Sequence, residues 1–154
     1  MRLILNTYLS ALITHNSNAS TVKVLESLFL QRFIPLYNED IIIEYEDVLH
    51  RRKFKLTEDQ IRLVIDCVKQ NGIDSERFSY DGIMPDEDDR VFYEVALSEE
   101  DSFLVTGNLK HFPKTPKVIT AAQMMEILDH EFYPLSTFCY IPTVSRHRRL
   151  IHGI

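Results

Sequence analysis

Short apolar runs alternate with segments of helical periodicity along most of this chain, and this alternation restricts its fold more than any other feature. Four apolar runs are typical of buried strands, at residues 2–5, 32–37, 102–106 and 117–119. Between them, apolar side chains recur every three or four residues, as they do on one face of a helix. Strands that alternate with helices form parallel sheets covered on both faces. The sequence therefore predicts an α/β fold in three layers, with a central, mainly parallel sheet.

Local sequence also indicates where several helices begin. Thr57 and Thr120 each stand three residues before a glutamine, which is the pattern of a capping box. Ser20 and Thr21 are expected to cap the helix that follows them. Further helices are expected around residues 9–13, from Asn38 onward and after residue 89.

The chain has 154 residues, of which 45% are hydrophobic, and this size suits one domain with a single core. We expect that domain to span residues 1–130. Residues 131–154 mix aromatic, proline and basic residues and are expected to form a C-terminal extension. An edge strand, a partner-binding arm and a disordered end all stay open for this extension.

Apolar runs are too short for a membrane span, which needs ~18 residues, and the first residues turn polar too early for a signal peptide. We therefore expect a cytoplasmic protein with no membrane partner. Cys67 and Cys139 are interpreted as ordinary thiols. The formal charge of −6 argues against a protein that coats nucleic acid with a general basic surface, but it does not exclude a nuclease.

Glu44 falls on the apolar stripe of its predicted helix, three residues after Ile41 and four before Val48. A carboxylate that faces a core is costly unless it is paired, hydrogen-bonded or bound to a metal. The alternative is a glutamate at the edge of the stripe that reaches solvent.

Asp86 begins a run of four acidic residues that ends at Asp89, just before a predicted helix. Four neighbouring carboxylates repel one another, and a cation relieves that repulsion. The alternative is Asp86 as the N-cap, with Asp88 and Asp89 complementing the helix dipole in the first turn.

Asn6 and Asn108 follow the carboxyl ends of two predicted strands. In open parallel sheets the ligand crevice lies beyond those ends, so both asparagines are candidates for a binding site. Asparagine also suits turns, which is the alternative. His111, in the same loop as Asn108, is interpreted as a solvated side chain rather than a ligand.

Four short motifs occur in a familiar order: Asn6-Thr7 after a strand, Glu44-Tyr45 within residues 42–49, Pro85 to Asp89 before a helix, and residues 104–108 followed by His111-Phe112. In this order and spacing the chain resembles the PIN-domain family, especially its toxin-like branch. The resemblance covers about residues 1–130.

This resemblance implies a metal-dependent ribonuclease with Mg²⁺ or Mn²⁺ bound by acidic residues at the carboxyl edge of a parallel sheet. It implies the toxin of a type II toxin–antitoxin system, with RNA as substrate, an antitoxin protein as partner and a homodimer or higher oligomer. By position, Glu44, Asp86 and Asp89 correspond to metal ligands. Asn6, Glu44, Asp89 and Asn108 make up the expected catalytic set.

Asn6 departs from the family pattern, which typically has an Asp-Thr-Asn opening. A neutral amide in place of a central carboxylate is expected to weaken metal binding and catalysis. A natural variant of an active enzyme, a decayed enzyme and a deliberate substitution all stay open as explanations. A catalytically inactive PIN-fold module that binds RNA or a protein partner is the alternative function.

RNA contacts are expected from a basic cluster that follows the predicted helix of residues 38–49 or from a second cluster near the end of the chain. The first comprises Arg51, Arg52 and Lys53, and the second spans residues 146–149. A solvated surface is the alternative reading of either cluster.

Overall fold

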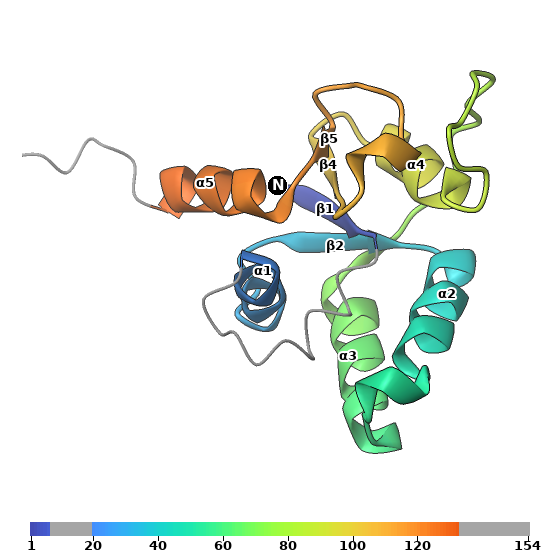
Figure 1. Ribbon diagram of the computed structural model, residues 1–154. Helices are drawn as coiled ribbons and strands as arrows, with labels where there is room; N and C mark the ends of the chain where they lie inside the picture. The colour runs from blue at the N-terminus through green and yellow to red at the C-terminus, as the bar shows by residue number, and fades with distance from the viewer. Residues whose placement is uncertain (7–19, 133–154) are drawn as a thin grey trace, which may run out of the picture.

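The computed structural model describes residues 1–6 and 20–132, and a five-stranded parallel sheet lies at its centre (Figure 1). The strands are β1 (Arg2–Leu5), β2 (Ile34–Tyr37), β3 (Ile73–Asp74), β4 (Ser102–Val105) and β5 (Val118–Ile119). Their order across the sheet is β3-β2-β1-β4-β5, and each neighbouring pair is parallel. The predicted parallel sheet is confirmed.

Helices cover both faces of this sheet. They are α1 (Ser20–Phe29), α2 (Glu39–Leu49), α3 (Glu58–Asn71), α4 (Arg90–Leu97) and α5 (Ala121–Phe132). The helix α1 packs against α3 and α5, whereas α4 packs against β1, β2 and β4. In Figure 1, α4 and α5 lie on opposite sides of the central strands, which gives the three-layer α/β/α fold expected from the sequence.

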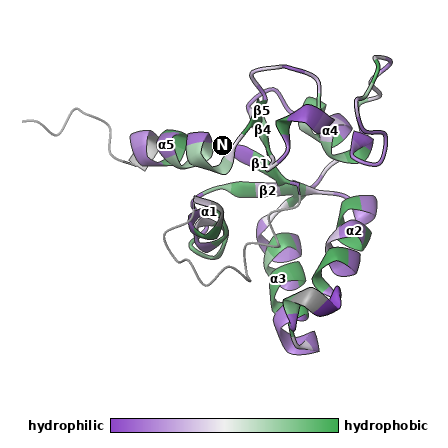
Figure 2. Cartoon of the chain, in the orientation of Figure 1, coloured by the Kyte–Doolittle hydropathy of each residue, from purple (hydrophilic) through white to green (hydrophobic). Residues whose placement is uncertain are grey.

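The core forms where the apolar faces of the helices meet the central strands (Figure 2). Leu3, Ile4 and Leu104 are fully buried, because β1 and β4 have neighbouring strands on both sides and helices over both faces. Strands in that position read as continuous apolar runs, which is why the sequence revealed them.

Capping contacts confirm most of the predicted helix starts. Both predicted capping boxes are present: the Thr57 hydroxyl accepts from the Gln60 N–H, and the Thr120 hydroxyl from the Gln123 N–H. The Asn38 side chain caps α2 by accepting the Ile41 N–H at 2.9 Å. The helix α1 begins at Ser20, so Ser20 and Thr21 lie within the helix rather than before it.

The reading of Asp86 as the N-cap of α4 is wrong. This helix begins at Arg90 with Asp89 as the N-cap, and the Asp86 carboxylate accepts the Asp88 N–H at 3.2 Å. Asp86 therefore shapes the turn before the helix.

Three short elements were not predicted: β3 and the one-turn 3₁₀ helices η2 (Arg52–Phe54) and η3 (Leu109–His111). The expected helix at residues 9–13 and most of the expected C-terminal extension lie outside the described residues. Among the described helices, none has the length and apolar character needed to cross a membrane.

Candidate functional site

Polar residues follow the strands at their carboxyl edge and form a neutral, buried floor there. Leu5 pairs with Val105, so Asn6 and Thr106 continue two neighbouring strands at the same level. The Asn6 N–H donates to the Val105 carbonyl at 3.0 Å, and Asn6 and Thr106 are 3% and 1% exposed. Asn6 is thus placed at the sheet edge, as predicted.

The helix α2 is fastened to this edge by Tyr45. Its hydroxyl donates to the Leu5 carbonyl at 2.6 Å, and its ring lies 6.2 Å from that of Phe92 on α4. Burial raises the pKa of Tyr45, so the phenol stays protonated and remains a donor. This hydrogen bond ties α2, the helix that carries Glu44, to the end of β1.

Glu44 is at the border of the core, not inside it. Its side chain is 50% exposed, and its carboxylate lies 3.9 Å from the Arg51 guanidinium. Partial burial raises the pKa of Glu44, Arg51 opposes this rise, and Asp47, Asp89 and Asp88 add to it. The alternative of a solvent-reaching glutamate therefore holds, but its carboxylate lies within electrostatic range of the acidic run.

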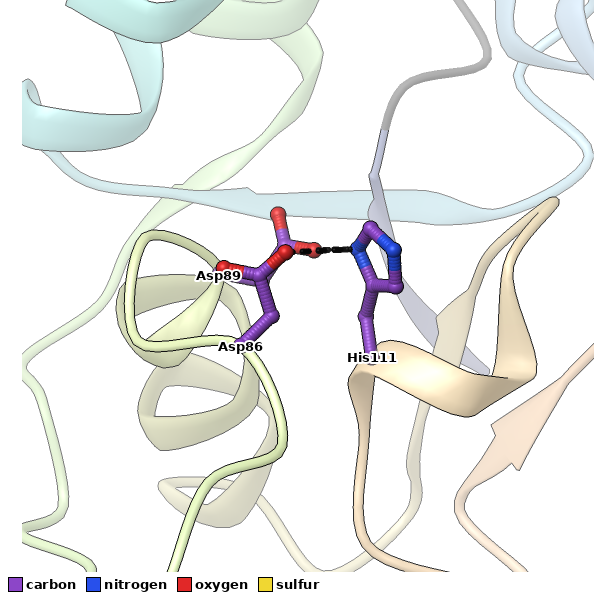
Figure 3. Close-up of side chains that lie close together, drawn as sticks. All are labelled: Asp86, Asp89 and His111. Atoms are coloured by element: carbon purple, nitrogen blue, oxygen red, sulfur yellow. Dashed lines mark hydrogen bonds and ion pairs between the residues drawn. The ribbon is translucent and has the colours of Figure 1, made fainter.

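Asp86, Asp89 and His111 converge from two loops that are far apart in the sequence (Figure 3). The His111 Nδ1 lies 2.8 Å from an Asp89 carboxylate oxygen and 2.9 Å from one of Asp86. The Asp89 side chain is 18% exposed and that of Asp86 34%. The interpretation of His111 as a merely solvated side chain is wrong, because η3 brings it between the two carboxylates.

These three side chains fit a divalent ion. Their candidate ligand atoms all lie within 4.8 Å of one another. Neighbouring ligands around an octahedral ion with bonds of ~2.1 Å stand about 3 Å apart, which is close to the two separations from His111. Carboxylates suit Mg²⁺ and Mn²⁺, whereas an imidazole nitrogen suits transition metals, so this donor set favours Mn²⁺ over Mg²⁺.

A buried carboxylate behind the site fixes the loop that carries Asp86 and Asp89. Glu94 on α4 accepts from the Tyr80 N–H at 3.1 Å and from the Arg77 guanidinium at 2.7 and 2.8 Å. Burial raises the pKa of Glu94, but these donors and Arg90 outweigh it, so the pKa lies below its usual range. Sequence reasoning missed Glu94, although a glutamate between Tyr93 and Val95 in an apolar helix was the available sign.

Arg90 completes this support at the start of α4. Its guanidinium donates to the Tyr80 and Gly82 carbonyls and pairs with Glu87 at 2.6 Å. The hydrogen bonds of Arg90 lower the pKa of Glu87. Arg90 and Glu94 together anchor the chain between Tyr80 and Glu87, which leads into the loop that carries Asp86 and Asp89.

Other residues predicted for the site are not among the three that converge. Asn108 is exposed, and its N–H donates to the Thr106 hydroxyl at 3.1 Å. Arg51 pairs with Asp47 at 3.4 Å and with Glu44, so its guanidinium is already neutralised by protein carboxylates. Arg52 is exposed and Lys53 lies beside it in η2.

A family model described as a PIN domain matches residues 5–110, which is more than half of the chain. This chain therefore belongs to the PIN-domain family. Its all-parallel sheet and the acidic group at the carboxyl edge agree with that membership. PIN domains are in general nucleases that use divalent metals and bind RNA. No curated protein and no solved structure matches the chain significantly.

Proposed function

We propose that this PIN domain is a metal-dependent endoribonuclease with its active site at the carboxyl edge of the sheet. The observation that supports this most strongly is the convergence of Asp86, Asp89 and His111 at ligand spacing. Glu44 approaches the same group from α2, and its pKa responds to the charge of Asp89. Membership of a family whose members are generally nucleases supports this function.

Asp86, Asp89 and His111 would hold the ion, with Mn²⁺ preferred and Mg²⁺ as the second choice. When bound, a divalent ion neutralises charge on the scissile phosphate and makes a water molecule a better nucleophile. Glu44 would serve as the general base for the attacking water, and its raised pKa suits that role. Asn6 and Asn108 complete the polar edge as neutral groups.

The finer assignment rests on the resemblance of the sequence motifs to the toxin-like branch. Under this assignment the protein is the toxin of a type II toxin–antitoxin system, acts in the cytoplasm as a homo-oligomer and is silenced by an antitoxin protein. Residues 131–154 would then serve as an extension to the domain of residues 1–130. Arg51, Arg52 and Lys53 stay candidates for RNA contacts.

Asn6 favours a second candidate function, a catalytically inactive module that binds RNA or a protein. The buried floor of the site has a neutral amide where the family typically has a carboxylate, and His111 already partners both aspartates. A site with reduced negative charge holds a divalent ion less strongly.

Cleavage of single-stranded RNA in Mn²⁺ by the wild-type protein and by Asn6→Asp separates these functions. We expect weak cleavage by the wild-type protein and faster cleavage by Asn6→Asp, because the added carboxylate strengthens the metal site. The matched control is Asn6→Asp combined with Asp89→Asn, which should be inactive. Cleavage by neither protein would overturn the nuclease proposal in favour of the inactive module.

A further inference from the structure

We infer that single-stranded RNA reaches the active site across the loop between β4 and β5, residues 107–117, named here the basic loop. This inference rests on the proposed function and specifies the face on which the substrate lies. In Figure 1 this loop, with η3, is the segment that leads from β4 to β5 on the same side of the sheet edge as the start of α4. It carries His111, so the loop itself reaches the proposed metal site.

Charge distribution distinguishes this segment from the rest of the chain. The protein has a formal charge of −6, yet residues 102–125 contain no acidic residue and include Lys110, Lys114 and Lys117. On the opposite side of the site, residues 86–89 are all acidic. A polyanion is therefore repelled from one flank of the site and attracted to the other.

Two of the three lysines are available to phosphate groups. Lys110 and Lys114 are exposed, and neither forms a salt bridge with any residue in the described part of the chain. Lys117 has a different role, since its ammonium donates to the Glu99 and Glu100 carbonyls at 2.6 and 2.8 Å. Burial lowers the pKa of Lys117, in agreement with this structural role.

Arginines close to the site are engaged elsewhere. Arg51 pairs with Asp47, Arg77 with Glu94, and Arg90 with Glu87. Neutralised guanidinium groups offer little net attraction to RNA. Lys110 and Lys114 are therefore more available to the substrate than Arg51, Arg77 and Arg90.

A groove in the basic loop suits an unpaired base. It has a volume of about 340 Å³ and lies beside the edge strand β5. Its lining is mainly apolar, from Leu109, Pro113, Pro116 and Val118, with Lys114 and Thr115 as the polar members. This volume is near the lower end of ordinary ligand pockets (~300–1,000 Å³), which is room enough for one unpaired base.

Apolar and cationic groups are thus interleaved along this loop in the manner of single-strand recognition. Proteins hold single strands by contacts to the base faces, strongest on aromatic rings, and by cations along the backbone. Here leucine and proline side chains offer the apolar contact, and only an unpaired strand exposes its base faces to them. Leu109 is 45% exposed and lies two residues before His111. A base on Leu109 would place the neighbouring phosphate close to the metal site.

The test compares RNA binding by the wild-type protein and by Lys110→Ala/Lys114→Ala. Fluorescence anisotropy of a short labelled oligouridylate in EDTA, across ~50–200 mM salt, measures affinity without cleavage. Each lost phosphate contact lowers the salt dependence by about 0.7. We expect the slope of log K against log salt to become less negative by about 1.4, with roughly tenfold weaker binding at ~100 mM salt.

Lys23→Ala/Lys69→Ala is the matched control, because it removes the same charge from exposed positions on α1 and α3. The control should keep the wild-type slope. Leu109→Ser should weaken binding at every salt concentration without changing the slope, since it removes an apolar contact and no charge. Circular dichroism melting checks that all variants keep the fold.

Two contrary outcomes are distinguishable. If the wild-type protein binds RNA and the basic-loop variant keeps the wild-type slope, the proposed path is wrong while the nuclease proposal stands. That result would show that RNA does not bind along the groove in the basic loop. If the wild-type protein binds no RNA at any salt concentration, the proposed path fails as well, and cleavage in Mn²⁺ decides the nuclease proposal separately.

Discussion

Two glutamates flank the acidic loop that carries Asp86 and Asp89, and they differ in burial and in the direction in which their pKa is shifted. Glu94 on α4 is 6% exposed and is surrounded by Arg77, Arg90 and the Tyr80 N–H, so its pKa is lowered. Glu44 on α2 is half-exposed, has Arg51 alone as a cationic contact among the described residues, and has a raised pKa.

This difference distinguishes a carboxylate that stabilises the fold from one that is available to bind an ion. A carboxylate that is fully compensated by donors stabilises the fold and has no remaining capacity for a ligand. A carboxylate whose negative neighbours outnumber its cations gains when an additional cation binds. Glu94 therefore fixes the loop, whereas Glu44 belongs to the face where an ion is expected.

The largest effect should come from Glu94→Ala, which leaves two guanidinium groups and a backbone N–H without their buried acceptor. Breaking a buried pair by removing one partner costs about 3 kcal/mol. Urea unfolding followed by circular dichroism measures this loss in the free energy of unfolding. Glu26→Ala, at an exposed position on α1, should change it by less than ~0.5 kcal/mol. Similar effects of the two substitutions would contradict the supporting role of Glu94.

Acid should reveal the same contrast through the pH dependence of stability. The folded pKa of Glu94 is below its unfolded value of 4.5, so its stabilisation is fully present above about pH 4.5. It is lost as the pH falls through the lower folded pKa. Glu94→Gln should therefore make the acid limb of unfolding shallower than in the wild-type protein. An unchanged acid limb would show that Glu94 is not held in its charged form.

Glu44→Gln should produce the smallest effect on the fold and should act in the opposite direction. Because the folded pKa of Glu44 is raised, its negative charge opposes folding at neutral pH when no ion is bound. We expect an unchanged or slightly higher melting temperature in EDTA. The gain in the free energy of unfolding should be a few tenths of a kcal/mol at most, since the side chain is half-exposed. In Mn²⁺ the order should reverse, because the wild-type protein gains more from the ion. A clear loss of stability in EDTA would show that Glu44 stabilises the fold, as Glu94 does.

Periodicity and capping patterns were sufficient for most of the fold. The apolar runs at β1 and β4 and the capping boxes at Thr57 and Thr120 act within a few residues, so they are readable from the sequence. The strand β3 has two residues and no apolar run, and it exists because β2 offers Leu36 and Tyr37 as partners. Elements that depend on a distant partner leave little local trace.

The site was predictable in part for the same reason. Asn6 follows β1 at the sheet edge that the strand order implied, and helical spacing placed Glu44 where its pKa responds to Asp88 and Asp89. Helical periodicity gives the face on which a residue lies but not how deeply it is buried. The exposed fraction of the Glu44 side chain could therefore not be predicted. His111 was missed, because its contact with Asp89 joins positions 22 residues apart in the sequence.

Calorimetric titration of Mn²⁺ into the wild-type protein and Asp89→Asn tests most directly whether Asp86, Asp89 and His111 form a metal site. Asp66→Asn, on the exposed face of α3, is the matched control. The account predicts saturable binding to the wild-type protein and to Asp66→Asn, with most of the affinity lost in Asp89→Asn. Equal binding by all three proteins, or no binding by the wild-type protein, would contradict it.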